Sequence, residues 1–106
     1  MTWESSSEAV RAFVDERDWS QFHSADNLAK SIAIEAGELL ECFQWSTNGQ
    51  SAEVERELAD VLIYCLLLAD RIGADVDDLI AAKIEENARK YPVDLARGRS
   101  EKYDRL

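Results

Sequence analysis

Apolar residues recur every three to four positions over most of the chain, which is the period of an amphipathic helix. No stretch shows the strict alternation or the hairpin turn residues of β-structure, so the pattern predicts an all-α fold. A first helix is expected to end near Arg17, with Ser5 and Glu8 forming a capping box at its start. Its apolar face consists of Val10, Phe13 and Val14.

A second helix is expected over about residues 26–45, with Ser24 or Asp26 as its cap. A polar loop around Gly49 separates it from a third helix, over about residues 52–72, for which Ser51 is the expected cap. The apolar face of the second helix consists of Leu28, Ile32, Leu39 and Phe43.

The third helix is expected to stop at Gly73, because glycine readily adopts the backbone conformation that ends a helix. A fourth helix then runs from Asp75 to about Tyr91, where Pro92 prevents its continuation. Residues 93–106 are polar and are expected to be irregular or to form a short helix.

The third helix is apolar on all sides between Val61 and Ala69. A helix of this kind is normally buried on all sides. Four helices in one small chain rarely enclose one of their number, so we expect a homo-oligomer with this helix in the interface. The alternative is that the second helix and the C-terminal tail cover it within one chain.

Two pairs of carboxylates stand out on the second and third helices. Glu35 and Glu38 are three residues apart, as are Glu57 and Asp60, so each pair lies on one helix face. If the two helices pack antiparallel, the four carboxylates converge and repel one another. A divalent cation would remove this repulsion, and an all-oxygen ligand set favours Mg²⁺ or Mn²⁺. The alternative is two solvated acidic pairs.

Glu41 extends the first acidic row by another three residues. It is either a further ligand, a group that orients the ligands, a general base or a solvated side chain. A di-iron centre in a four-helix bundle requires Glu-x-x-His pairs. The only histidine is His23, which lies outside both acidic rows, so a di-iron centre is excluded.

Charge and composition narrow the range of functions. The chain has 106 residues, enough for one domain, and a net charge of -10. This charge excludes binding to a nucleic acid polymer through its phosphates. Residues 1–78 contain 5 basic and 17 acidic side chains, whereas residues 79–106 contain 7 basic and 5 acidic ones. The asymmetry suits a metal-bridged anion, or else reflects solubility together with complementarity to the helix dipoles.

The two cysteines, Cys42 and Cys65, match no zinc motif and are expected to be buried and reduced. The N-terminus lacks a signal-peptide pattern, and the longest apolar run is too short to span a membrane. We therefore expect a cytoplasmic protein without a membrane partner.

Five segments together carry a resemblance to a known family. The chain resembles the MazG-like nucleoside triphosphate pyrophosphohydrolases, which are all-α, and is most similar to their dCTP pyrophosphatase branch. The resemblance covers about residues 8–105. The segments are Arg17–His23, Glu35–Glu41, Phe43–Trp45, Glu57–Tyr64 and Lys90–Val93.

The resemblance implies a role for each matching position. It implies Mg²⁺ ligands at Glu35, Glu38, Glu57 and Asp60, a base pocket at Trp19, His23 and Trp45, and a phosphate-facing row at Lys83, Asn87, Lys90 and Tyr91. The chain departs from the family at two positions. Ile34 stands where the broader family often has glutamate, and Val10 stands where the animal branch has histidine.

Without the resemblance, the residues themselves leave two alternatives for each of these roles. Each tryptophan could stack on a base or pack in a core. His23 could contact a base edge or make local loop contacts. Lys83, Asn87 and Lys90 share one helix face, which could bind phosphate or face solvent. Tyr64 shares a face with Glu57 and Asp60, and could support the site or pack in the core.

We therefore expect one MazG-like domain over residues 1–106, a four-helix bundle assembled as a dimer or tetramer. The expected activity is Mg²⁺-dependent cleavage of a deoxynucleoside triphosphate, dCTP or similar, between its α- and β-phosphates. Glu41 or Glu38 would accept the proton of the attacking water. The alternatives are a non-catalytic helical oligomerisation or regulatory module, and a hydrolase of another or modified nucleotide.

Overall fold

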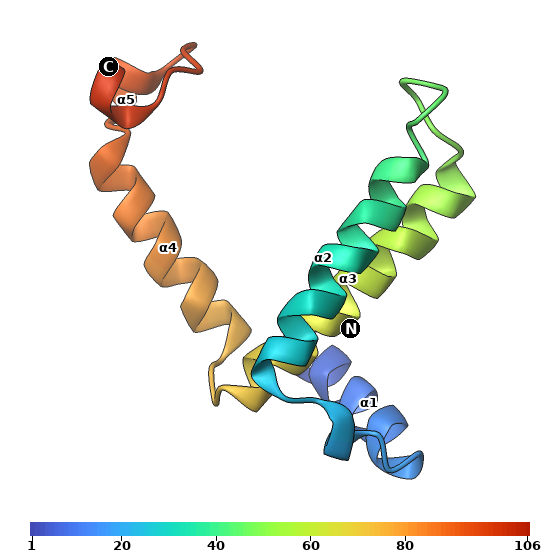
Figure 1. Ribbon diagram of the computed structural model, residues 1–106. Helices are drawn as coiled ribbons and strands as arrows, with labels where there is room; N and C mark the ends of the chain where they lie inside the picture. The colour runs from blue at the N-terminus through green and yellow to red at the C-terminus, as the bar shows by residue number, and fades with distance from the viewer. The chain divides into compact units, whose positions relative to one another are not determined.

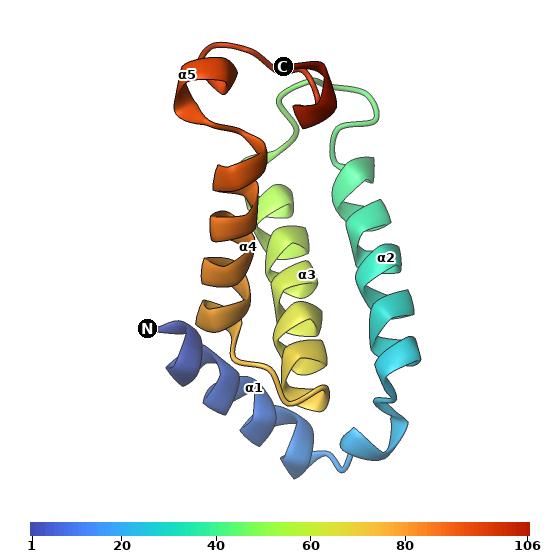
Figure 2. The same ribbon diagram turned by 90° about the vertical axis from the view of Figure 1, so that its left-hand side faces the viewer.

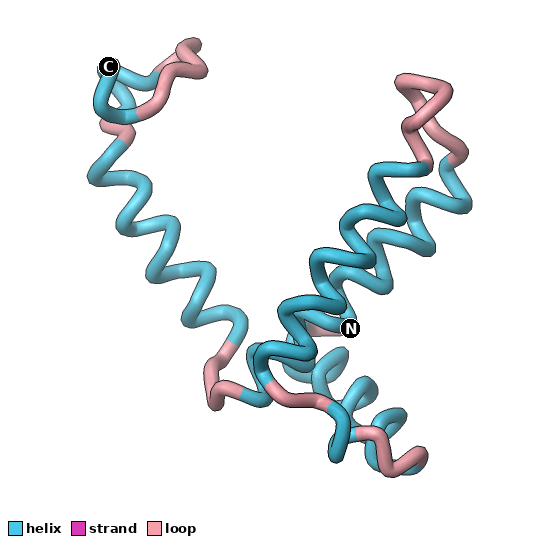
Figure 3. The backbone as a smooth tube through the Cα atoms, in the orientation of Figure 1, coloured by secondary structure: helices cyan, strands magenta, loops and turns pink.

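The computed structural model describes residues 1–106 and contains only helices, turns and loops (Figures 1 and 3). The all-α prediction is confirmed. The helices are α1 (Trp3–Glu16), α2 (Ala25–Glu41), α3 (Ser51–Arg71), α4 (Val76–Lys90) and α5 (Val93–Ala96), with short 3₁₀-helices η1 (Ser20–Phe22) and η2 (Tyr103–Arg105).

The chain forms two compact units, residues 1–74 and residues 75–106. In the first unit, α2 and α3 lie side by side along their length, and α1 packs against α3 (Figures 1 and 2). A short loop joins α2 to α3, so the two helices run antiparallel, as the convergence of the acidic pairs requires. The second unit contains α4, α5 and η2.

The core of the first unit forms where α1, α2 and α3 meet. Each helix contributes one buried aliphatic side chain: Val14, Leu28 and Leu67. Leu28 is only 1% exposed. Burial of a leucine side chain contributes roughly 1.5–3 kcal/mol, so this contact fixes α2 against both neighbours.

The helix ends differ in detail from the sequence prediction. The capping box of α1 uses Thr2 and Ser5, not Ser5 and Glu8, so the helix begins earlier than expected. Ser24 caps α2, and it was one of the two caps that the sequence offered. Gln50, not Ser51, is the N-cap of α3, because its backbone is extended while its carbonyl accepts the Val54 N–H.

The predicted end of α2 near residue 45 is wrong, because the helix ends at Glu41. After Glu41, the amides of Phe43 and Gln44 bond to carbonyls three residues back, which tightens the chain into turns. The turn then reaches Gly49 at φ 62°, where a side chain would meet Val54 at 3.0 Å. Only glycine fits this loop without strain.

The predicted stop of α3 at Gly73 is confirmed. Gly73 has φ 71°, its N–H donates to Asp70 O, and the Ala74 N–H donates to Ala69 O. These two bonds form a Schellman motif, in which a residue with positive φ satisfies the last carbonyls of a helix. No helix of the chain is both long enough and apolar enough to cross a membrane.

The face of α3 that was expected to be enclosed is exposed in part. Leu66 and Leu67 are buried, but Leu62 and Ile63 are 38% and 39% exposed. Both cysteines are free, as expected, yet Cys65 is exposed and Cys42 only partly buried. The predicted burial of Cys65 is wrong for the single chain, because it lies on this exposed side of α3.

Candidate metal centre

The antiparallel pair α2 and α3 brings three acidic residues together: Glu35 from α2, and Glu57 and Asp60 from α3. One carboxylate oxygen of each lies within 4.8 Å of the other two. The three-residue spacing of Glu57 and Asp60 places both on the face of α3 that meets α2. The structure thus joins carboxylates from both predicted pairs.

Two oxygens of this cluster are buried without a partner. Glu35 Oε2 and Glu57 Oε2 are inaccessible to solvent and accept no hydrogen bond. A buried carboxylate oxygen without a partner is costly, whereas a hard divalent cation is a natural partner for several such oxygens. The donor set and its two unpaired oxygens therefore fit a cation of the Mg²⁺ class.

The fourth predicted ligand, Glu38, adjoins this cluster without belonging to the group of three oxygens. Glu35 raises the pKa of Glu38, as a hydrogen-bond partner of its protonated form and as a negative charge. Desolvation raises the pKa of Glu57, and the charges of Glu38 and Asp60 raise it further. Both shifts mean that the carboxylates of this cluster disfavour one another's ionisation.

A hollow of about 240 Å³ lies directly beside the cluster. It contains Glu41, the proposed proton acceptor. The full lining is Glu38, Glu41, Cys42, Glu53, Arg56 and Glu57. Burial raises the pKa of the Cys42 thiol, so this part of the wall remains uncharged at neutral pH.

Sequence reasoning missed two residues of this hollow, Glu53 and Arg56. Glu53 precedes Glu57 by four residues, so helical spacing alone places both on one face of α3. Arg56 is the only basic residue between Lys30 and Arg71, and its charge partly offsets the raised pKa of Glu57. Both signals were present in the sequence.

The predicted base-binding tryptophans lie at opposite ends of α2. Trp19 precedes the helix and Trp45 follows it, and a helix of 17 residues is about 25 Å long. Trp19 packs edge-on against Phe13 at 5.7 Å and is 44% exposed, whereas Trp45 is 90% exposed. One chain therefore does not bring both indoles to the same base.

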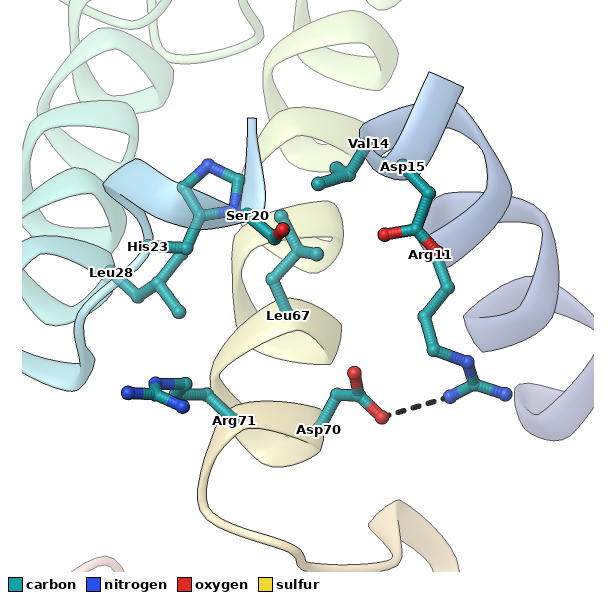
Figure 4. Close-up of a pocket in the computed structure, with 9 residues that line it drawn as sticks. All are labelled: Arg11, Val14, Asp15, Ser20, His23, Leu28, Leu67, Asp70 and Arg71. Atoms are coloured by element: carbon teal, nitrogen blue, oxygen red, sulfur yellow. Dashed lines mark hydrogen bonds and ion pairs between the residues drawn. The ribbon is translucent and has the colours of Figure 1, made fainter. Parts of the chain in front are cut away.

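His23 lines a different hollow of about 310 Å³, formed by α1, η1 and the ends of α2 and α3 (Figure 4). His23 and Arg71 lie on one side of it and Arg11 and Asp15 on the other, with Arg11 paired to Asp70 at 3.0 Å. His23 thus lies near the Trp19 end of α2, away from Trp45.

Tyr64 packs against the buried cluster of Val14, Leu28 and Leu67. Of the two alternatives for this residue, the structure therefore shows core packing. Its place one helical turn from Asp60 still leaves it on the same face of α3 as the acidic residues.

The predicted phosphate-facing row belongs to the second unit. Lys83, Asn87 and Lys90 share one face of α4, and Tyr91 is its C-cap. Glu86 lies between the two lysines and pairs with both, at 3.1 Å in each case. Lys90 and Lys83 lower the pKa of Glu86, and Glu86 raises the pKa of Lys90.

A model of the MazG-like family matches residues 30–106, which include every residue of the acidic cluster. The chain belongs to the MazG-like family. The match begins within α2 and runs through α3 and α4 to the C-terminus, so it covers both acidic pairs and the lysine row.

Named relatives of this MazG-like chain agree with the family match. It is 42% identical over 104 residues to dCTP pyrophosphatase 1 of Homo sapiens, and 39% identical to that of Rattus norvegicus. Each alignment covers 89% of this chain and 61% of the relative. The chain thus spans about three fifths of the length of these curated relatives.

A solved structure matches this chain over a larger share of its own length than the curated relatives do. The crystal structure of a pyrophosphatase from Archaeoglobus fulgidus superposes with a TM-score of 0.79 at 42% sequence identity. The match covers 84% of this MazG-like chain and 91% of the archaeal one.

Proposed function

We propose that this MazG-like chain is a divalent-metal-dependent nucleoside triphosphate pyrophosphohydrolase. Its substrate would be a deoxynucleoside triphosphate, dCTP or a similar one, cleaved between the α- and β-phosphates to a monophosphate and pyrophosphate. The observation that carries the proposal is the cluster of Glu35, Glu57 and Asp60, with its two buried, unpaired oxygens. The names of the relatives support the substrate class.

Glu35, Glu38, Glu57 and Asp60 would hold Mg²⁺, for which Mn²⁺ is a chemically similar substitute. When bound, the cation would neutralise charge on the phosphate oxygens and make water a stronger acid. Without a cation, four clustered carboxylates would repel the triphosphate of the substrate.

Glu41 is our candidate to accept the proton of the attacking water, at one of its carboxylate oxygens. It lies in the hollow beside the cluster, close to the ligands without being one of the three convergent residues. Glu38 is the alternative acceptor. In either case the anhydride bond breaks, and its electron pair leaves with pyrophosphate.

The binding residues would form two groups, one for the phosphates of the substrate and one for its base. Lys83, Asn87, Lys90 and Tyr91 would meet the phosphates, and Trp19, His23 and Trp45 would hold the base. Trp45 is separated from the other two by α2, a helix about 25 Å long. We therefore propose that a second copy of the chain, in a dimer or tetramer, supplies the missing aromatic wall. The cellular role would be removal of excess or non-standard nucleotides.

The test is to incubate the purified chain with each deoxynucleoside triphosphate, with and without Mg²⁺, and to identify the products. The expected products are pyrophosphate and a monophosphate, only with Mg²⁺ and fastest with dCTP. Release of orthophosphate and a diphosphate would overturn the assignment of the cleaved bond. No turnover of any nucleotide, with no Mg²⁺-dependent rise in melting temperature, would favour a non-catalytic regulatory module instead.

A further inference from the structure

The C-terminal segment folds back onto the end of α4. Tyr103, in η2, packs edge-on against Tyr91, with ring centroids 6.2 Å apart and an angle of 81° between the rings. Arg99 helps to close the segment, because its guanidinium donates to the carbonyl of Arg105 and pairs with Glu101. A residue twelve positions beyond Tyr91 is thereby placed beside the last turn of α4.

Two side chains, those of Tyr103 and Glu86, flank the Lys90 ammonium group. Its ammonium nitrogen lies 5.0 Å from the centroid of the Tyr103 ring and 3.1 Å from Glu86 Oε1. The Lys90 side chain is 37% exposed, compared with 59% for Lys83, which is ion-paired with Glu86 and has no aromatic ring over its ammonium group. An ammonium group over the face of an aromatic ring is attracted to it, and the ring restricts where the flexible side chain can go.

We propose that Tyr103 is a positioning residue, which holds the Lys90 ammonium group in place for a phosphate group of the substrate. This inference rests on the proposed function, in which Lys90 meets the phosphates. Lys83, held only by Glu86, is the less restrained member of the pair.

Glu86 and Tyr103 act differently on Lys90. The Glu86 carboxylate competes with phosphate for the ammonium group, since both are anions. The ring of Tyr103 carries no charge and attracts the ammonium group without competing for it as an anion. Tyr103 can therefore retain its contact while Lys90 binds phosphate, and we assign the positioning role to Tyr103.

The test compares Tyr103→Ala with Tyr103→Phe. A cation–π contact at an exposed site changes an equilibrium about two- to fivefold. Tyr103→Ala should raise KM for the triphosphate and weaken pyrophosphate binding by about this factor, with kcat little changed. Tyr103→Phe keeps the ring and should restore wild-type values. If the phenylalanine variant behaves like the alanine variant, the ring contact is not the cause and the proposal fails.

A double-mutant cycle with Lys90→Met separates positioning from a general loss of structure. In the Lys90→Met background, Tyr103→Ala should have no further effect on pyrophosphate binding, measured by calorimetry. An undiminished effect in that background would overturn the proposal. Pyrophosphate binding needs no turnover, so a chain that hydrolyses no nucleotide would refute the proposed function while this cycle still decides the role of Tyr103.

Discussion

At the scale of single residues, the acidic cluster of Glu35, Glu57 and Asp60 is the part of the structure that most directly indicates a metal ligand set. Glu35 and Glu57 each bury one carboxylate oxygen that has no hydrogen-bond partner. A side chain in a stable fold normally satisfies such an oxygen with a donor. No neighbouring donor does so here, so the two oxygens fit the ligand set of a hard cation.

Replacement of Asp60 by asparagine tests the cluster directly. The change removes one anionic ligand and one repulsive charge, so Mg²⁺ binding should weaken about tenfold or more, and turnover should be lost. The melting temperature without metal should not fall, because repulsion within the cluster decreases. Thermal melts with and without Mg²⁺, together with product analysis, provide both measurements.

The matched control for this variant is Glu55→Gln, which removes the same charge from an exposed position of α3 outside the cluster. It should keep both the Mg²⁺-dependent rise in melting temperature and the activity. A fully active Asp60→Asn protein would contradict the assignment of Asp60 as a metal ligand.

Arg56 is the one positive charge in the hollow beside the cluster. Because its charge opposes a cation at the carboxylates, Arg56→Gln should strengthen Mg²⁺ binding about two- to fivefold, the scale of one partly exposed charge contact. Titration of the melting temperature with Mg²⁺ measures this affinity. A weaker affinity in the variant would mean that Arg56 instead holds the carboxylates in position.

At the scale of helices, the spacing of residues along the sequence predicted which acidic side chains share a helix face. The i, i+3 pairs predicted that Glu35 would come close to Glu57 and Asp60, because helix geometry fixes which side chains share a face, and their carboxylate oxygens lie within 4.8 Å of one another. The Gly73 stop was also predictable, since few residues adopt positive φ at low cost. The Gly73 stop depends on the local sequence alone, whereas the meeting of the acidic residues also requires α2 and α3 to run antiparallel.

Features that depend on contacts between distant residues could not be predicted in the same way. The early end of α2 depends on how its loop closes around Gly49, against Val54 and Phe43. The separation of Trp19 from Trp45 follows from that helix length and from the turn at Asp18, which has φ 54°. The contact of Tyr103 with Lys90 joins two helices through an irregular segment with no sequence period.

Helix α4 provides a prediction on pH. Lys90 and Lys83 lower the pKa of Glu86 below its ordinary value of 4.5, so the ion pairs stabilise α4 above that pH. This contribution should be lost as the pH falls through the lowered pKa. A titration of the Glu86 carboxyl carbon by NMR should give a midpoint below 4.5. Methionine at both Lys83 and Lys90 should return the midpoint to the ordinary value.

At the scale of the whole molecule, the feature that bears on assembly is an apolar stripe on α3. We define this stripe by Leu58, Leu62 and Cys65. These residues follow one another at intervals of four and three, so they lie on one helix face. Leu58 and Leu62 are 44% and 38% exposed, and Cys65 is exposed as well. An apolar stripe of this kind is a natural contact for a second copy of the chain.

The expected outcome of placing a charge in this stripe is dissociation. Leu62→Asp would put an unpaired anion into an apolar contact. The variant should therefore sediment as a monomer, whereas the wild type is expected to sediment as a dimer or tetramer. Cys65 serves as an internal reporter. In the wild type its thiol should react slowly with a thiol reagent, and in Leu62→Asp it should react fast.

Glu55→Gln on the same helix should change neither the mass nor the thiol reactivity. A wild-type chain that sediments as a monomer with a fast-reacting Cys65 would refute the predicted assembly. It would also remove the second copy that the proposed base pocket needs, since α2, about 25 Å long, separates Trp45 from Trp19. Activity from such a monomer would then require a base pocket built without Trp45, and Trp45→Ala should leave its KM unchanged.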